Sequence, residues 1–393
     1  MIYLDNAATT QIDTKVLEAM LPYLESQFGN PGGIYKLGRD AKAAVEKARK
    51  QVADLINAEP DQIIFTSGAT EANNMVFTIT QQMLEESGRK DIYVSAIEHQ
   101  SVLKSAQNMA IKHGFYLHTF LPKKDCFSEH KYLAGKVNKD TALVSAMYAN
   151  NEVGLIQNVH EIGRICKQNG ALFHTDCVQA AGCNPIDVQS IRCDFATLSA
   201  HKIHGPKGVG ALFIKDKERF SPMIFGGSDQ EFGLRGGTEN VAGIVGFGKA
   251  CELAKNCVDN GINTYFYSLG KAFASGLQTG FIRSENKDYR WYFNGNTGYG
   301  IKTISITFPN VDAQSLILAL DNQDICVSAG SACDSHDNVP SHVLKAIGLS
   351  DDAARQTIRV SFSKMNTGEE VFDAGEIIGR CVTDLLKTNV YKG

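Results

Sequence analysis

The strongest constraint on the fold is an alternation of short apolar runs with amphipathic stretches along residues 62–214. The runs have the length and β-branched content of buried strands, and the stretches between them repeat their apolar residues at helical spacing. This alternation predicts an α/β fold in which a mostly parallel sheet is covered by helices on both faces. We expect strands at 62–66, 92–95, 142–147, 171–175, 195–198 and 210–214, and helices at 71–84, 101–113 and 159–169.

Polar residues follow five of these expected strands. The stretches are Ser67–Thr70, Glu98–His99, Asn150–Glu152, Asp176 and Ser199–Lys202. Parallel strands end at one edge of a sheet, and ligands of open α/β sheets bind in the crevice outside those ends. The sequence therefore predicts that the five stretches converge on one ligand site.

Lys202 lies in the loop Ser199–Gly208, between two apolar runs that we expect to be buried strands. Burial disfavours the charged form of a lysine, so a lysine delivered to the interior needs a carboxylate partner or a chemical use. Formation of a Schiff base removes the charge and is such a use. From the loop alone, a structural lysine bound to a carboxylate is equally consistent.

Three other positions at this edge are candidates for ligand chemistry. Ser67–Thr70 ends a strand and opens a helix, which suits a phosphate, although an ordinary helix N-cap fits the same residues. Asp176 could bind a metal, cap a helix or pair with a protonated ring nitrogen, and His99 could be structural, a stacking surface or an acid–base group. Neither a Walker loop nor G-x-G-x-x-G after the first strand occurs, which argues against a nucleotide-binding protein.

The composition changes near residue 258, which predicts a second, smaller α/β domain. The predicted large domain is 13–257, and the predicted small domain combines 1–12 with 258–393. We expect helices at 262–278, 312–322, 343–347 and 369–386, and strands at 302–308, 325–328 and 357–362.

Two residues of the smaller domain are candidates for chemistry. Cys333 lies among small residues in Ser328–His336, within a loop of about 328–340, and a thiol presented in this way is a candidate nucleophile. Arg359 lies within an expected strand and could bind a carboxylate with its two-pronged guanidinium, although an ordinary salt bridge fits as well. None of the ten cysteines forms a C-x-x-C pair or a zinc-type cluster, so no metal is expected.

Bulk composition narrows the class of protein. The chain has 393 residues, 43% of them hydrophobic, and a net charge of −4, which gives no overall reason to expect nucleic-acid binding. No apolar run approaches the ~20 residues that span a bilayer, and the first residues lack the basic and apolar regions of a signal peptide. We therefore expect a cytoplasmic protein.

The stretches quoted above, together with Tyr3–Thr10 and Ile358–Arg359, resemble the cysteine desulfurases. These are pyridoxal-phosphate (PLP) enzymes of the class V aminotransferase fold, and the matching motifs span nearly the whole chain. The resemblance implies PLP-dependent transferase fold type I, with a large domain built on a seven-stranded, mostly parallel sheet and a smaller α/β domain.

The resemblance also implies a role for each candidate residue. Lys202 would carry PLP and move the substrate's α-proton, Asp176 would pair with the pyridine nitrogen, and His99 would stack on the ring. Cys333 would receive the sulfur, and Arg359 with Asn151 would bind the substrate. The other implied contacts are Gln179 and Asn151 near the ring hydroxyl, and Ala69, Thr70, Ser199 and His201 at the phosphate. Thr238, in the segment 235–240, would reach the phosphate of a partner subunit, which implies a homodimer.

The implied reaction converts L-cysteine to L-alanine, with a persulfide on Cys333 that passes to an acceptor protein. The loop resembles the longer-loop subgroup that supplies iron–sulfur cluster assembly, tRNA thiolation or DNA phosphorothioation. Two alternatives remain open: a selenocysteine lyase or cysteine β-lyase of the same fold, and a mainly docking component of a sulfur-transfer complex. The sequence departs from the family at Asp334, whose carboxylate beside Cys333 would disfavour the thiolate.

Overall fold

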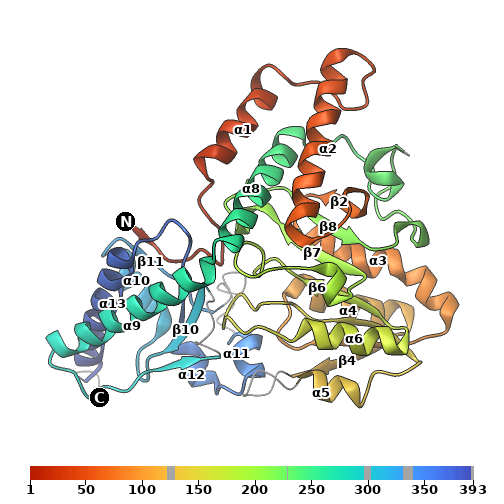
Figure 1. Cartoon of the computed structure of the whole chain (residues 1–393). Coiled ribbons are helices and arrows are strands. Elements are labelled where there is room, and N and C mark those ends of the chain that lie inside the picture. The colour runs from red at the N-terminus through yellow and green to blue at the C-terminus, as the bar shows by residue number, and fades with distance from the viewer. Residues whose placement is uncertain (122–128, 228, 296–301, 331–339, 391–393) are drawn as a thin grey trace. The chain divides into compact units, whose positions relative to one another are not determined.

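The computed structural model of the chain describes residues 1–121, 129–227, 229–295, 302–330 and 340–390 (Figure 1). The chain forms two compact units. The terminal unit comprises Met1–Thr9, Asn150–Ile156 and Asn260–Gly393, and the central unit comprises Thr10–Ala149 and Gln157–Asp259. Where independently folding domains begin and end, near 13 and 258, stays a prediction.

A seven-stranded sheet forms the core of the central unit. Its strands, in spatial order, are β2 (Ile63–Thr66), β8 (Gly210–Ile214), β7 (Phe195–Ser199), β6 (Leu172–Asp176), β5 (Thr141–Ser145), β3 (Asp91–Ser95) and β4 (Tyr116–Phe120). Strands β7, β6, β5, β3 and β4 are parallel, and β8 is antiparallel to both of its neighbours. The predicted α/β fold with a mostly parallel sheet is confirmed.

Because β8 reverses direction, β2 runs the same way as β7, and the carboxyl ends of β2, β3, β6 and β7 lie at one edge. Strand β4 was not expected from the sequence. It is an edge strand whose residues are mostly exposed or half-buried, so it lacks the apolar run that marks a buried strand.

The helices of the central unit begin and end at recognisable caps. Helix α4 (Gln100–His113) is capped by the side chain of His99 and is followed by the left-handed Gly114. Helix α6 (Val159–Asn169) is capped by the side chain of Asn158 and is followed by the left-handed Gly170. The helices are α1 (Thr14–Glu25), α2 (Lys36–Ile56), α3 (Ala69–Ser87), α4 (Gln100–His113), α5 (Glu129–Ala134), α6 (Val159–Asn169), α7 (Val188–Ile191) and α8 (Val241–Asp259). Short 3₁₀ turns are η1 (Pro60–Gln62), η2 (Ala200–Lys202), η3 (Lys217–Arg219) and η4 (Gln230–Gly233).

The terminal unit is built from two small sheets and helices. Strand β1 (Ile2–Tyr3) pairs in parallel with β11 (Ile325–Cys326), and β10 (Thr303–Thr307) pairs antiparallel with both β12 (Thr357–Ser361) and β9 (Tyr292–Asn294). Its helices are α9 (Ile262–Arg283), α10 (Ala313–Asp321), α11 (His342–Ala346), α12 (Asp351–Arg355) and α13 (Gly368–Val390). Helices α9 and α13 pack along each other (Figure 1).

Candidate active site

Four of the five predicted polar stretches meet the sheet edge of the central unit. Ser67–Thr70 follows β2, Glu98–His99 follows β3, Asp176 ends β6, and Ser199–Lys202 ends β7 and forms η2. The fifth stretch, Asn150–Glu152, belongs to the terminal unit. The convergence expected from the sequence is therefore present for the four stretches of the central unit.

The loop that carries Lys202 is held from both sides by the segment that precedes α1. The hydroxyl of Thr10 donates to the carbonyl of His201 at 3.0 Å and accepts from the N–H of His204 at 2.8 Å. The imidazole Nδ1 of His204 lies 2.8 Å from the carbonyl of Gln11, and the residue has a left-handed φ of 66°. These bonds fix the turn after β7 and leave Lys202 half-buried at its end.

The turn between β2 and α3 forms an open cradle at a helix N-terminus. Gly68 has φ 153°, and a Cβ built on it meets no atom of the described chain within 4 Å. A Cβ on Gly210 would lie 2.8 Å from the Cα of Gly68, so only glycine lets β8 pass this close. The N–H groups of Ala69 and Thr70 open a 19-residue helix, which favours an anion.

Asp176 is a buried acceptor at the end of β6, with 4% of its surface exposed. Its Oδ1 accepts from the N–H of Val178 at 2.9 Å, and its Oδ2 accepts from Nδ2 of Asn73 at 2.9 Å. Two further ionisable groups, Glu98 and Cys177, lie close enough to Asp176 for its negative charge to affect them. Burial and the nearby Asp176 raise the pKa of Glu98 well above its usual range, and the same two causes raise the pKa of the Cys177 thiol.

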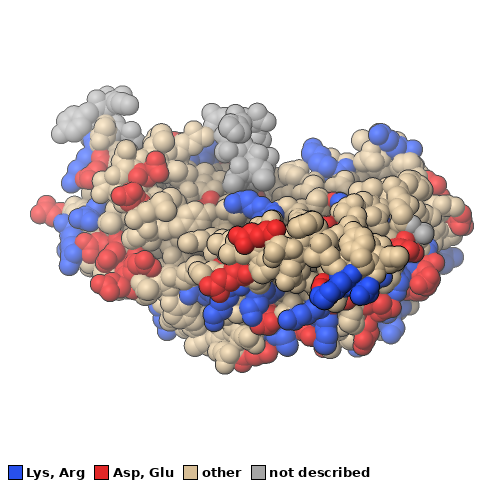
Figure 2. Space-filling model, turned by 90° about the horizontal axis from the view of Figure 1, so that it is seen from above, with Lys and Arg blue, Asp and Glu red and all other residues tan. Residues whose placement is uncertain are grey.

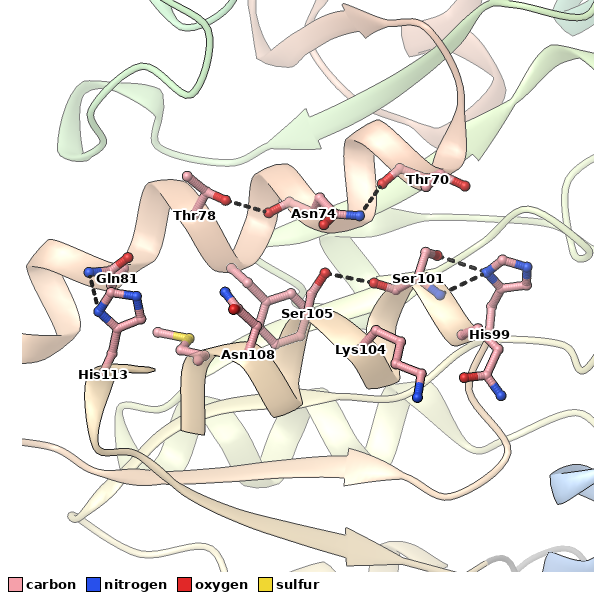
Figure 3. A pocket seen from close by; sticks show the side chains of 13 residues that line it. Thr70, Asn74, Thr78, Gln81, His99, Ser101, Lys104, Ser105, Asn108 and His113 are labelled. Atoms are coloured by element: carbon pink, nitrogen blue, oxygen red, sulfur yellow. Dashed lines mark hydrogen bonds between the residues drawn. The ribbon is translucent and has the colours of Figure 1, made fainter. Parts of the chain in front are cut away.

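His99 caps α4 and is held by Ser101. The Nδ1 atom of its ring accepts from the N–H of Ser101 at 3.1 Å and lies 2.8 Å from the Ser101 hydroxyl, and Figure 3 shows the ring turned toward this serine. His99 and Thr70 lie among the residues that line a cavity of about 440 Å³ between α3 and α4. The flat ring is thus presented by the same helix pair that supplies the anion cradle.

In the terminal unit, Arg359 is a buried guanidinium with 2% of its surface exposed. Its Nη2 donates to Oδ1 of Asp5 at 2.7 Å and its Nη1 to the carbonyl of Asn151 at 3.2 Å. Its Nε is buried and has no hydrogen-bond partner in the part of the chain that the structure describes. A buried N–H of this kind can donate to a carboxylate oxygen of a ligand.

The remaining predicted residues are placed as follows. Gln179 is buried just after β6, Ser199 is buried, His201 and Asn151 are half-buried, and Thr238 is exposed. Cys333, with its neighbour Asp334, lies outside the described residues. The other cysteines of the described chain are buried or half-buried and carry free thiols.

Sequence reasoning missed Asn73, Ser101 and Asp5. A signal existed for Asn73, because it stands among the apolar residues Ala72, Met75 and Val76 on the buried face of α3, where an amide needs partners. No local signal pointed to Asp5, whose pairing with Arg359 joins positions 354 residues apart.

The donor set fits PLP. The buried carboxylate of Asp176 can accept from the protonated pyridine nitrogen, and the helix N-terminus with its open glycine can bind the phosphate. The His99 ring can stack on the cofactor ring, and Lys202 can attach to the cofactor's aldehyde group.

Comparisons with known proteins agree with this chemistry. The family model for Aminotransferase class-V matches residues 2–373. The cysteine desulfurase IscS of Dictyoglomus turgidum (strain DSM 6724 / Z-1310) is 40% identical over 394 residues, which cover 100% of this chain and 97% of that protein. A solved NifS-like protein has a TM-score of 0.87 at 34% identity, with 98% of this chain and 99% of that chain covered. The structure of SspA in complex with cysteine has a TM-score of 0.75 at 32% identity, with 92% and 99% covered.

The chain is a member of the class-V aminotransferase family, whose members use PLP. Within that family it belongs with the cysteine desulfurases. The fold expected from the resemblance is confirmed by the same matches.

Proposed function

We propose that this protein is a PLP-dependent cysteine desulfurase that converts L-cysteine to L-alanine and holds the released sulfur as a persulfide on Cys333. One observation carries the proposal. The anion cradle at the start of α3 follows β2, and His99 follows β3. Asp176 ends β6 and Lys202 lies in the turn after β7, so all four groups stand at one edge of the sheet. The name of the relatives and the cysteine bound to SspA support the substrate.

The cradle and the sheet edge would hold the cofactor. Ala69, Thr70, Ser199 and His201 would bind the phosphate. Asp176 would accept from the pyridine nitrogen, Gln179 and Asn151 would bond near the ring hydroxyl, and His99 would cover the ring face. When bound, PLP supplies an electron sink for the substrate's α- and β-carbons.

The chain's own groups would do the rest. Lys202 would attach the cofactor and take the proton from the substrate's α-carbon. Arg359 would bind the substrate carboxylate. The N–H at its Nε, which has no partner among the described residues, supports this role. The Cys333 thiolate would attack the substrate's sulfur, so that an S–S bond forms while the Cβ–S bond breaks and its electrons return to carbon with a proton. The products are alanine and a persulfide, and the atoms balance.

Lys202→Ala should give a folded protein that no longer attaches PLP covalently, because no other lysine ends β7. Borohydride reduction followed by peptide mass spectrometry measures the attachment. Full activity and covalent PLP in this variant would contradict the assignment of Lys202.

Cys333→Ser should retain covalent PLP and lose both persulfide formation and alanine release, because the sulfur then has no nucleophile to receive it. Alanine, pyruvate and cysteine-dependent sulfide are measured side by side. If the Cys333→Ser variant consumes cysteine at the wild-type rate and releases sulfide with pyruvate and ammonia, the protein is a β-lyase, the alternative that the relatives do not favour. If the wild type turns over no cysteine at all, the protein is instead mainly a docking component of a sulfur-transfer complex.

The acceptor and the assembly are further parts of the proposal. The sulfur would pass to an acceptor protein, a scaffold or a thiolation enzyme. The protein would act as a homodimer in which Thr238 reaches the partner's phosphate. Support comes from Thr238 itself, which is exposed, and from Phe225, which is 83% exposed at the start of the same loop region.

A further inference from the structure

The side-chain amide of Asn73 is buried in the central unit, with none of its surface exposed. Its Nδ2 donates one hydrogen to Oδ2 of Asp176 at 2.9 Å and the other to the hydroxyl of Ser101 at 2.9 Å. Its Oδ1 is buried and has no hydrogen-bond partner within the described chain. An amide that leaves its oxygen unpaired is held by its donors, because the flipped amide would turn that oxygen toward the Asp176 carboxylate.

The second hydrogen bond of Asn73 leads to His99. Since the Ser101 hydroxyl accepts from Asn73, its own hydrogen is available to Nδ1 of His99, 2.8 Å away. The N–H of Ser101 also points at Nδ1, at 3.1 Å. Two donors on Nδ1 make that nitrogen an acceptor, so the ring hydrogen of neutral His99 sits on Nε2. The amide of Asn73 therefore connects Asp176, at the end of β6, to the tautomer of His99 at the start of α4. Figure 3 shows the part of this chain that joins Ser101 to the His99 ring.

We propose that Asn73 is a positioning residue that fixes both side chains assigned to the cofactor ring, Asp176 directly and His99 through Ser101. The proposal rests on the proposed assignment of Asp176 and His99 to PLP.

The groups around Asp176 explain why its carboxylate depends on the hydrogen bond from the Asn73 amide. The neighbouring acids, Glu98 and Cys177, are buried and favour their neutral forms, for the reasons given above. Among the described residues, Val178 and Asn73 donate to the Asp176 carboxylate, one to each oxygen. Loss of Asn73 would leave Oδ2 without a donor and Asp176 less well oriented toward a pyridine nitrogen.

The test compares Asn73→Ala with Asn73→Asp. Asn73→Asp keeps the side chain's size and replaces the donor with an oxygen that faces Asp176. Titration of the apoprotein with PLP should show binding weakened about tenfold in Asn73→Ala, the effect expected for a lost hydrogen bond to a charged group. Asn73→Asp should bind more weakly still. The matched control is Thr80→Val, because Thr80 is equally buried on α3 and, within the described chain, its hydroxyl donates only to backbone carbonyls of its own helix.

A packing role would give the opposite order, because Asn73→Ala opens a cavity and Asn73→Asp does not. Wild-type PLP affinity in both variants, or stronger binding by Asn73→Asp than by Asn73→Ala, overturns the proposal. Asp176→Asn and His99→Ala are measured in parallel. If these two bind PLP like the wild type, the assignment of the site fails, whereas if only the Asn73 variants do so, the positioning role alone fails.

A second measurement determines the tautomer of His99 in the apoprotein and does not depend on enzyme activity. In ¹⁵N-histidine NMR spectra, His99 of the wild type should show an unprotonated Nδ1 and a protonated Nε2. Ser101→Ala should give a mixture of the two tautomers, because one of the two donors on Nδ1 is lost. This variant keeps the Asn73–Asp176 bond, so it serves if neither Asn73 variant folds. An unchanged single tautomer in Ser101→Ala overturns the link from Asn73 to His99.

Discussion

At the scale of single residues, the central unit buries several ionisable groups behind its sheet edge. His174 is fully buried on β6, where Nδ1 lies 2.8 Å from the Ser145 hydroxyl and Nε2 lies 3.1 Å from that of Thr197. Burial lowers the pKa of His174 from 6.5 to about 3, so the folded protein keeps the ring neutral. The ring acts as a neutral bridge between β5, β6 and β7.

This neutral histidine predicts a pH dependence of stability. Between pH 6.5 and about 3 the unfolded chain binds a proton at His174 and the folded chain does not, so stability falls as the pH falls through that window. From pH 6.5 to 5.5 this one group should remove roughly 1 kcal/mol of the free energy of unfolding.

Urea unfolding at both pH values measures this loss, and His174→Asn should make the dependence shallower. If the variant does not fold, NMR of the wild type decides the point. A His174 ring that takes up a proton near pH 6 in the folded protein would contradict the prediction.

At the scale of elements, glycines set how closely helices approach. In the terminal unit, Gly276 and Gly280 on α9 face Gly375 and Gly379 on α13. A Cβ on Gly276 would overlap the carbonyl oxygen of Phe372, and a Cβ on Gly379 would lie 2.7 Å from that of Leu277. The two helix backbones therefore touch, which no larger residue at these positions would allow.

Gly276→Ala should lower the free energy of unfolding by about 2 kcal/mol, because the added methyl forces α9 and α13 apart. Gly270→Ala is the matched control on the same helix, since its Cβ would meet only Ile304 Cδ1 at 3.7 Å. The control should be neutral or stabilising by up to about 1 kcal/mol. Chemical denaturation of both variants measures the difference, and equal stabilities would show that the helix contact relaxes without cost.

At the scale of the whole molecule, the surface carries mixed charge. Acidic and basic side chains both occur across the face drawn in Figure 2, in keeping with a net charge of −4. No helix among the described residues is long and apolar enough to cross a membrane. A cytoplasmic location stays a prediction.

The proposed homodimer predicts complementation between two inactive variants. In a mixed dimer, the Thr238→Asp chain keeps its own Lys202 and receives Thr238 from the Lys202→Ala chain, so one site is complete. Mixing the two variants under conditions that exchange subunits should restore cysteine-dependent alanine formation. Sedimentation should show a dimer in each sample. A fully active monomer, or no recovery after proven exchange, would contradict the role of Thr238.

The sequence alone was enough to predict the α/β class, the strand–helix alternation of the central unit, and the position of the polar residues after the strands. These features follow from local periodicity and from turn chemistry, both of which are written in contiguous residues. The family motifs added the expected roles of Lys202 and Asp176. Strand β4, with its exposed edge, had no such local signal.

Only the tertiary structure decided which partners these residues meet. The reversal of β8, the Asp5–Arg359 pair, the glycine contact of α9 with α13, and the bonds of Asn73 to Asp176 and Ser101 all join residues far apart in the chain. Their partners are set by how the elements pack, and a single sequence carries no local pattern for a contact between distant segments.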